Sequence, residues 1–276
     1  MATVRLDIEY DGTRFSGWAA QPGRRTVQGV LESALATALR EDVTLTVAGR
    51  TDSGVHAWGQ VASFETAADV PADLASRLNG IGPRDVAVTS AAVVRNGFDA
   101  RRDARSRTYC YRVLARSAPS PLEQDRALWW PHRLDIALLE ACAAILPGLH
   151  DFTAFTPTET EHQRFERNVI QAGWVSEGDH PAVADSRLRL DRASPGPSLI
   201  PPGRAGAEQA AGILSFWIEA DAFMRNMARV LVGTMLEVAS GRRSVADFEA
   251  LLDGRPRSDA GETAPPWGLY LAAISY

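Results

Sequence analysis

Apolar and charged residues alternate over residues 4–10, at the start of the chain. This period of two is typical of a strand with one buried face. The Asp11-Gly12 pair that follows predicts a turn. The first element is therefore predicted to be a β-strand over residues 4–10.

A helical period comes next. Thr26 is a residue type that caps helices, and the apolar positions over 27–38 share one helical face. The same patterns assign the rest of the chain. Further strands are predicted over 44–47, 60–65, 86–94, 108–115, 168–176, 213–220 and 269–276, and further helices over 71–78, 135–146, 223–239 and 245–252.

The order of these elements predicts an α+β fold. Strand, helix, strand, strand, helix, strand and strand in the first half is close to a ferredoxin-like or RRM-like unit, and the second half repeats it loosely. We expect two similar halves, 1–104 with the polar loop discussed below and 105–276. A Pro/Gly-rich insertion at about 176–210 has the composition of an irregular surface segment.

Charge changes this picture locally. The formal net charge is −5, which argues weakly against a polyanionic partner. However, all 29 basic residues are arginine, and Arg95–Arg116 holds seven of them against Asp99 and Asp103. A local basic stripe of this kind is the footprint of a nucleic-acid binder. A solvated strand pair with scattered ion pairs is the alternative.

Familiar cofactor and targeting signals are absent from the sequence. It has no Walker-type glycine loop, no dinucleotide-binding glycine motif and no pair of histidines at metal-binding helical spacing. No apolar run reaches about 18 residues, and the alternating charged and apolar residues at 1–10 predict that this segment is not a signal peptide. Cys110 and Cys142 fit free thiols in a reducing cytosol, so we expect a cytoplasmic protein. An enzyme here would use side chains, without a metal or cofactor.

The densest polar cluster lies in the loop between the strands predicted at 44–47 and 60–65. Asp52 follows Arg50 and precedes Ser53-Gly54, where glycine permits a sharp turn. A carboxylate on a loop held by rigid strands can act as a covalent nucleophile if it stays ionised, which calls for a nearby arginine. An ordinary turn, in which Asp52 only bonds the backbone, is the alternative.

The segment Arg50-Thr51-Asp52-Ser53-Gly54-Val55-His56-Ala57 resembles the catalytic motif of the tRNA pseudouridine synthase A (TruA) family. The resemblance continues in order along the whole chain except the insertion. Its other segments are residues 9–18, 25–29, 98–101, 107–111, 150–155, 222–233 and 268–271. It implies that the antiparallel sheets of the two halves join into one large sheet, with helices on one side and a cleft between the halves.

The resemblance also implies roles for single residues. Asp52 is the nucleophile, and attack on the ribose and attack on the uracil both stay open. Arg229 would keep Asp52 charged, and Arg50 would hold the flipped nucleotide or fill its place. Tyr109 would stack on the uracil, and Leu269 or Leu271 would form an apolar wall. Without the resemblance, Tyr109 and both leucines are ordinary core candidates, and Arg229 is a surface arginine.

The implied activity is the conversion of uridine to pseudouridine at positions 38, 39 and 40 of the tRNA anticodon arm, without a cofactor. The implied partners are tRNA and a second copy of the chain, as a homodimer. The expected contacts with the RNA backbone are Arg101, Arg102, Arg105 and Arg107. Two other classes remain as alternatives: a non-catalytic RNA-binding module, and an enzyme that acts on a small molecule.

Overall fold

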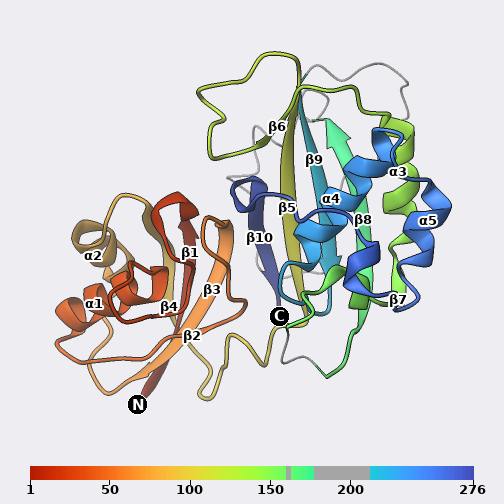
Figure 1. The fold of residues 1–276 in the computed structure, drawn as a ribbon. Helices are drawn as coiled ribbons and strands as arrows, with labels where there is room; N and C mark the ends of the chain where they lie inside the picture. Colours follow the sequence, from red (N-terminus) through yellow and green to blue (C-terminus); the bar gives the residue numbers. More distant parts are fainter. Residues whose placement is uncertain (160–162, 177–211) are drawn as a thin grey trace. The chain divides into compact units, whose positions relative to one another are not determined.

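The computed structural model describes residues 1–159, 163–176 and 212–276 (Figure 1). The predicted insertion at 176–210 lies outside these residues apart from Ser176. The described residues form ten strands of a mixed, mainly antiparallel sheet, five α-helices and several short 3-10 helices, which confirms the α+β class. The strands are β1 (Ala2–Tyr10), β2 (Thr46–Val47), β3 (His56–Thr66), β4 (Val86–Val94), β5 (Ser106–Ala115), β6 (Leu128–Trp130), β7 (Gly148–Asp151), β8 (Glu166–Ser176), β9 (Gly212–Ala220) and β10 (Leu269–Ser275). The helices are α1 (Val27–Leu39), α2 (Leu74–Ile81), α3 (Ile136–Ile145), α4 (Met227–Ala239) and α5 (Val245–Ala250).

The chain divides into two compact units. Unit 1 contains Met1–Thr108 together with Tyr270–Tyr276, and unit 2 contains Tyr109–Leu269. Most of β10 therefore belongs to unit 1, although all of unit 2 precedes it in the sequence. The division of the chain into two related halves, 1–104 and 105–276, stays a prediction.

In unit 1, β1 is the central strand, with β3 and β4 antiparallel on either side of it. The short β2 pairs antiparallel with β3. Tyr270 and Leu271 of β10 pair parallel with His56 and Ala57 of β3. The predicted alternation of β1 is confirmed, because Val4, Leu6 and Ile8 are at most 1% exposed. These buried side chains anchor β1, and Tyr10 at the end of β1 contacts the polar loop.

The first helix begins where the sequence predicts. The Thr26 side chain accepts a hydrogen bond from the Gly29 amide, as an N-cap residue does. Leu31 and Leu35 bury the inner face of α1, and the helix ends at Arg40 in a left-handed conformation with φ of 56°. The helices α1 and α2 pack together beside the strands of unit 1 (Figure 1).

In unit 2, β8 lies between β7 and β9 and pairs antiparallel with both. The helices α3, α4 and α5 pack against one another, and α3 also packs on β8 (Figure 1). The centre of this core is α4, where Val230, Leu231 and Met235 are fully buried. An apolar helix of this kind gives unit 2 a rigid interior.

Several element boundaries differ from the sequence prediction, which also misses two short strands. The helix predicted from Phe223 begins at Met227, because Asn226 adopts a left-handed conformation with φ of 62°, which α-helical backbone excludes. The strand predicted from Gln60 begins at His56. The strands β6 and β7, of three and four residues, are not predicted by the sequence, since so few residues show no clear period.

Candidate active site

The Asp52 loop of unit 1 is a tight turn closed by the main chain. The Val55 amide donates to the Asp52 carbonyl oxygen at 3.2 Å, and Gly54 has φ of 78°. The Asp52 and Arg50 side chains are both exposed. Among the described residues of unit 1, the Asp52 carboxylate makes no hydrogen bond or ion pair. The alternative in which this carboxylate merely bonds the backbone of its own turn is therefore not what the structure shows.

A second loop of unit 1, residues 15–18, holds this turn through hydrogen bonds. The Trp18 amide donates to the Thr51 carbonyl at 3.0 Å. The Phe15 carbonyl accepts from the Ser53 hydroxyl at 3.1 Å and from the Gly54 amide at 3.4 Å. Both sides of Asp52 are thus fixed by main-chain groups, while its side chain points to the exterior.

Two glycines allow the close approach of these loops. A Cβ atom on Gly12 would lie 1.9 Å from the Val55 carbonyl oxygen, which is a severe overlap. A Cβ on Gly17 would lie 2.9 Å from the Thr51 carbonyl oxygen, and its φ of 88° also disfavours other residues. Glycine is required at both points because backbone meets backbone there.

A buried polar layer lies beneath the turn. The Tyr10 hydroxyl is 2.7 Å from the Thr51 hydroxyl, and the Gln60 side-chain amide donates to the Gly49 carbonyl at 2.7 Å. Burial raises the pKa of Tyr10 to about 12, while its hydrogen bonds to Thr51 and Gln60 oppose that rise. The Tyr10 hydroxyl is therefore neutral at physiological pH.

His56, near the end of the motif, is buried and packs within unit 1. Its Nδ1 lies 3.0 Å from the Gly12 amide nitrogen and 3.3 Å from the Asp11 carboxylate. The His56 ring stacks on Tyr270 at 4.6 Å, and Tyr270 stacks on Trp58 at 4.2 Å. This stack joins β3 to β10 within unit 1.

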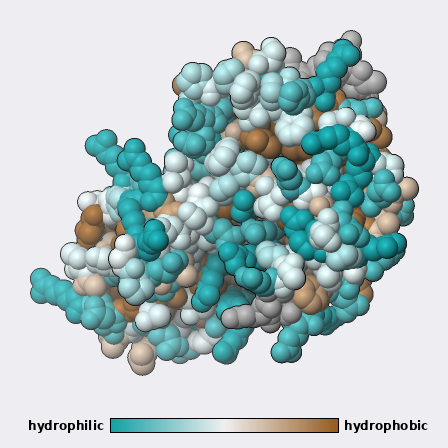
Figure 2. Space-filling view, viewed as in Figure 1, coloured by the Kyte–Doolittle hydropathy of each residue, from teal (hydrophilic) through white to brown (hydrophobic). Residues whose placement is uncertain are grey.

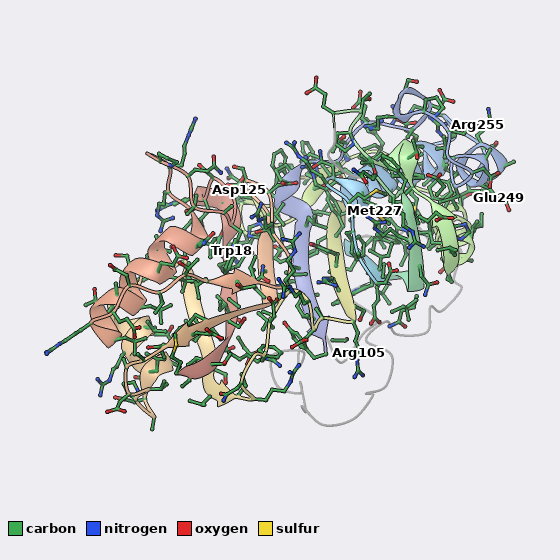
Figure 3. The ribbon with its side chains drawn as sticks, turned by 90° about the horizontal axis from the view of Figure 1, so that it is seen from below. Trp18, Arg105, Asp125, Met227, Glu249 and Arg255 are labelled. Atoms are coloured by element: carbon green, nitrogen blue, oxygen red, sulfur yellow. The ribbon has the colours of Figure 1, made fainter. Side chains whose placement is uncertain are left out.

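Three of the four predicted phosphate-binding arginines are exposed. Arg101, Arg102 and Arg105 lie on the surface of unit 1, and Figure 3 shows Arg105 pointing away from the ribbon. The Asp99 carboxylate accepts from the Arg101 and Arg102 amides at 2.8 and 2.9 Å, which fixes the turn that carries these two arginines. Hydrophilic residues are spread over the face shown in Figure 2, with smaller hydrophobic areas between them.

Arg107, the fourth predicted contact, is half-buried and bonds the backbone of its own unit. Its guanidinium donates to the carbonyls of Ala104, Ala48 and Arg101 at 3.0–3.2 Å. Arg107 therefore ties the segment that carries the exposed arginines to the end of β2. Its contact with RNA stays a prediction.

In unit 2, Tyr109 and Tyr111 have different surroundings. Tyr111 is fully buried, and its hydroxyl donates to the Pro265 carbonyl at 2.9 Å. Burial raises the pKa of Tyr111, and the charge of Arg229 opposes that rise. Tyr109 is only partly buried and meets the Phe223 ring edge-on, with ring centres 4.7 Å apart. Tyr111 is thus a core residue, whereas Tyr109 keeps part of its surface accessible.

Arg229 is held by its neighbours in unit 2. Its Nε donates to the Ala264 carbonyl at 2.7 Å, and one terminal nitrogen donates to the Asn226 side-chain oxygen at 3.0 Å. The Ala264 amide in turn donates to the Arg229 carbonyl at 3.1 Å. Arg229 is therefore not a surface arginine of the snorkelling kind, because its guanidinium is oriented by two acceptors. Met227, the first residue of α4, is labelled in Figure 3.

The two candidate wall residues are both buried. Leu269 is 6% exposed and belongs to unit 2, whereas Leu271 is fully buried and belongs to unit 1. A Cβ on Gly268 would lie 2.7 Å from the Tyr111 ring, so the chain before Leu269 packs closely on that tyrosine. Which leucine faces the base stays a prediction.

Sequence reasoning did not find several supporting residues. The sequence prediction places Tyr10 and Gln60 on strands and Phe223 and Asn226 on a helix, without a role at the site for any of them. The Tyr10 and Thr51 hydroxyls meet across 41 residues of sequence, and no local pattern signals such a contact. Asn226 carried one usable signal, since asparagine is enriched in left-handed conformations near helix ends.

The described residues show no metal site and no membrane-spanning helix. No group of three histidine, cysteine, aspartate or glutamate side chains in residues 1–159, 163–176 and 212–276 could hold a metal ion. Within the same ranges, every helix is too short or too polar to cross a bilayer. Cys110 and Cys142 are both free and buried.

Comparison with known proteins gives the class. The sequence model of a family described as tRNA pseudouridine synthase matches residues 8–101 and 142–276, so the chain belongs to the pseudouridine synthases. The matched ranges include Asp52 and Arg229 but not Tyr109.

Full-length relatives give the particular family. The tRNA pseudouridine synthase A of Frankia casuarinae is 39% identical over all of this chain and 90% of its own length. Those of Bacillus pumilus and Caldicellulosiruptor bescii are 35% and 31% identical, over at least 98% of each chain in both cases. Within the class, the chain belongs to the tRNA pseudouridine synthase A (TruA) family.

Proposed function

We propose that this protein converts uridine to pseudouridine at positions 38, 39 and 40 of the tRNA anticodon arm. The observation that carries the proposal is full-length similarity to tRNA pseudouridine synthases A. The main-chain-held turn that presents an exposed Asp52 supports it, because a non-catalytic RNA-binding surface has no need of a carboxylate aimed at a polyanion.

The proposed reaction is an isomerisation, balanced within one nucleotide. The bond from ribose C1′ to uracil N1 breaks, and a bond from C1′ to C5 of the same uracil forms. The C5 proton leaves and N1 gains a proton, so no electrons are exchanged with a co-substrate. The target base must first leave the stack of the anticodon arm.

In this proposal, each candidate side chain has one role. Asp52 is the nucleophile, and Arg229 favours its ionised form as a nearby cation does. Arg50 holds the flipped nucleotide or fills its place in the stack. Tyr109 stacks on the uracil, a contact type that contributes about 1–3 kcal/mol in single-strand binders. Leu269 or Leu271 provides an apolar wall near the base.

The proposed partner is tRNA, bound by a homodimer in the cytoplasm. Arg101, Arg102 and Arg105 suit phosphate because a guanidinium can donate two parallel hydrogen bonds to it. Arg107 is the fourth proposed backbone contact. We further propose that the two halves of the chain are related α+β domains.

Pseudouridine mapping of tRNA tests this function. Total tRNA from cells that lack the protein is treated with carbodiimide and mapped by primer extension, before and after incubation with the purified protein. The expected result is loss of pseudouridine at positions 38–40 and its return on incubation. Binding of tRNA without conversion would support the non-catalytic module instead. If the protein neither bound nor converted tRNA, an enzyme that acts on a small molecule would be favoured.

A further inference from the structure

Alternate residues of the Asp52 loop face in opposite directions. Arg50 and Asp52 are exposed, whereas Thr51 between them is 6% exposed. The inward groups of this segment, the Gly49 carbonyl and the Thr51 hydroxyl, each meet a buried side chain. The directions of Arg50 and Asp52 therefore depend on what their inward neighbours bond.

Two residues of the central strands make these inward bonds. Tyr10, at the end of β1, meets the Thr51 hydroxyl at 2.7 Å. Gln60, on β3, donates to the Gly49 carbonyl at 2.7 Å and to the Tyr10 hydroxyl at 3.3 Å. The Gln60 side-chain oxygen accepts from the Val61 amide at 3.1 Å, which fixes the orientation of its amide group.

The network is closed to solvent. Tyr10 is 5% exposed and Gln60 is fully buried, so water does not replace a missing partner easily. Tyr10 is also anchored by pairing with Ala57 on β3 and with Val86 on β4. A rigid strand pair thus reaches the loop through three side chains of low exposure.

We propose that Tyr10 and Gln60 are positioning residues, which aim Asp52 and Arg50 through hydrogen bonds to Thr51 and Gly49. This inference rests on the proposed function, since it assigns an aim to side chains that act on a bound uridine. Neither residue touches the reacting atoms. Their effect is on the geometry of the loop, where a displacement of about 1 Å can lower a reaction rate about 100-fold.

The Tyr10 hydroxyl suits this task because it keeps one protonation state. With a pKa of about 12, it does not ionise over the pH range of an enzyme assay. The aromatic ring of Tyr10 has a separate packing contact, since it lies 6.1 Å from the Trp18 ring. Tyr10→Phe therefore removes the hydroxyl and leaves the ring contact in place.

The first test compares single-turnover rates at saturating tRNA. Tyr10→Phe and Thr51→Val each remove one of the two hydroxyls, whereas Thr51→Ser keeps a hydroxyl at position 51. We expect about a 10- to 100-fold lower rate for the first two variants and a rate within about threefold of wild type for Thr51→Ser. The KM for tRNA should change much less than the rate, because the proposed backbone contacts Arg101, Arg102 and Arg105 are untouched and only the direction of Arg50 is affected.

Matched controls come from the same unit. Tyr276→Phe removes a hydroxyl that donates to the Ala100 carbonyl at 2.9 Å. Thr66→Val removes a buried hydroxyl that bonds Glu41, at the opposite end of β3 from His56. Both controls should react at the wild-type rate. Equal rate losses in controls and test variants would overturn the inference, because they would show a general effect of removing hydroxyls.

The second test is independent of tRNA. Hydrogen–deuterium exchange of the free protein reports on the amides of Trp18, Gly54 and Val55, which hold the turn. We expect at least about fivefold faster exchange in Tyr10→Phe and Thr51→Val, as in local opening. If both variants kept the wild-type exchange and the wild-type rate, the positioning role would be overturned. Conversion of tRNA by the wild type would still uphold the proposed function. Faster exchange without conversion by the wild type would overturn the proposed function, and with it the catalytic meaning of the network.

Discussion

Asp52 and Arg229 are held in opposite ways. In unit 1, the backbone around Asp52 is fixed by hydrogen bonds to Phe15 and Trp18, while its carboxylate has no partner among the described residues of that unit. In unit 2, the Arg229 guanidinium itself is fixed by Ala264 and Asn226. The difference indicates that the proposed nucleophile is aimed by its main chain, whereas the arginine is aimed by its side chain.

This contrast has a chemical rationale. A carboxylate that is not used in the hydrogen bonds of its own turn keeps its oxygens accessible to a substrate. An arginine stays charged in any environment, so orienting it by two carbonyl-type acceptors leaves its charge intact.

Asp52→Asn should separate activity from stability. We expect the rate of pseudouridine formation to fall at least about 1000-fold, because an amide cannot replace a nucleophilic carboxylate. The free energy of unfolding should change by no more than about 0.5 kcal/mol, since the side chain is exposed. Tritium release from labelled tRNA and thermal unfolding measure the two effects. Asp69→Asn, another exposed aspartate of unit 1, is the control and should retain full activity.

Gly12→Ala should show that the main chain does the aiming. The added Cβ would overlap the Val55 carbonyl, so the turn must move. We expect a loss of about 1–3 kcal/mol in unfolding free energy, as in overpacking, and about a 100-fold lower rate in the folded fraction. Gly80→Ala is the matched control, because its Cβ would meet no atom within 4 Å. A Gly12→Ala protein with a wild-type rate would contradict the backbone half of the comparison.

Arg229→Lys should lower both activity and stability. A lysine keeps the charge but cannot reproduce the fork that reaches Ala264 and Asn226 together. We expect a loss of about 1–2 kcal/mol in unfolding free energy and about a 10- to 100-fold lower rate. Chemical denaturation and single-turnover kinetics measure these changes. The exposed Arg225 provides the control Arg225→Lys. If Arg229→Lys were as stable as Arg225→Lys, the side-chain half of the comparison would be wrong.

Arg101→Glu combined with Arg105→Glu tests whether the exposed arginines of unit 1 bind tRNA. Unlike Arg107, neither has its guanidinium bonded to several backbone carbonyls. We expect about tenfold weaker tRNA binding at moderate salt. The slope of the logarithm of the binding constant against the logarithm of the salt concentration should become shallower by about one for each phosphate that is no longer neutralised. Stability should be nearly unchanged. Filter binding across a salt series measures the slope. Arg40→Glu with Arg84→Glu changes the net charge equally, and these residues are exposed in the same unit. Equal weakening by both pairs would indicate a net-charge effect and remove Arg101 and Arg105 from the proposed interface.

Much of the fold follows from the sequence because it depends on local patterns. The strand at residues 86–94 and the Thr26 cap are predicted at the positions where the structure has them. The start of α4 is not, because the apolar period continues through Phe223 and does not reveal the left-handed Asn226. Short elements such as β6 contain too few positions for any period.

For the candidate site, the sequence indicated the side chains and missed their support. Asp52 was indicated by the polar loop and by the resemblance, and Arg229 by the resemblance alone. The structure supplies the Tyr10, Gln60 and Phe15 contacts around the Asp52 turn. These bonds join residues up to 50 positions apart, so they depend on strand pairing and not on any local motif. Their prediction would require the register of β1 and β3 in advance.

The late position of β10 has a consequence for how the chain is made. Tyr270 stacks on His56, Ser275 accepts from the Arg105 amide, and Tyr276 donates to Ala100. A ribosome must therefore translate all of residues 109–269 before unit 1 can close, a delay on the order of ten seconds at about 5–20 residues per second. The nascent chain thus completes unit 1 only after Arg229 has been synthesised. A product of translation that stopped before Arg229 would lack both that arginine and the strand β10.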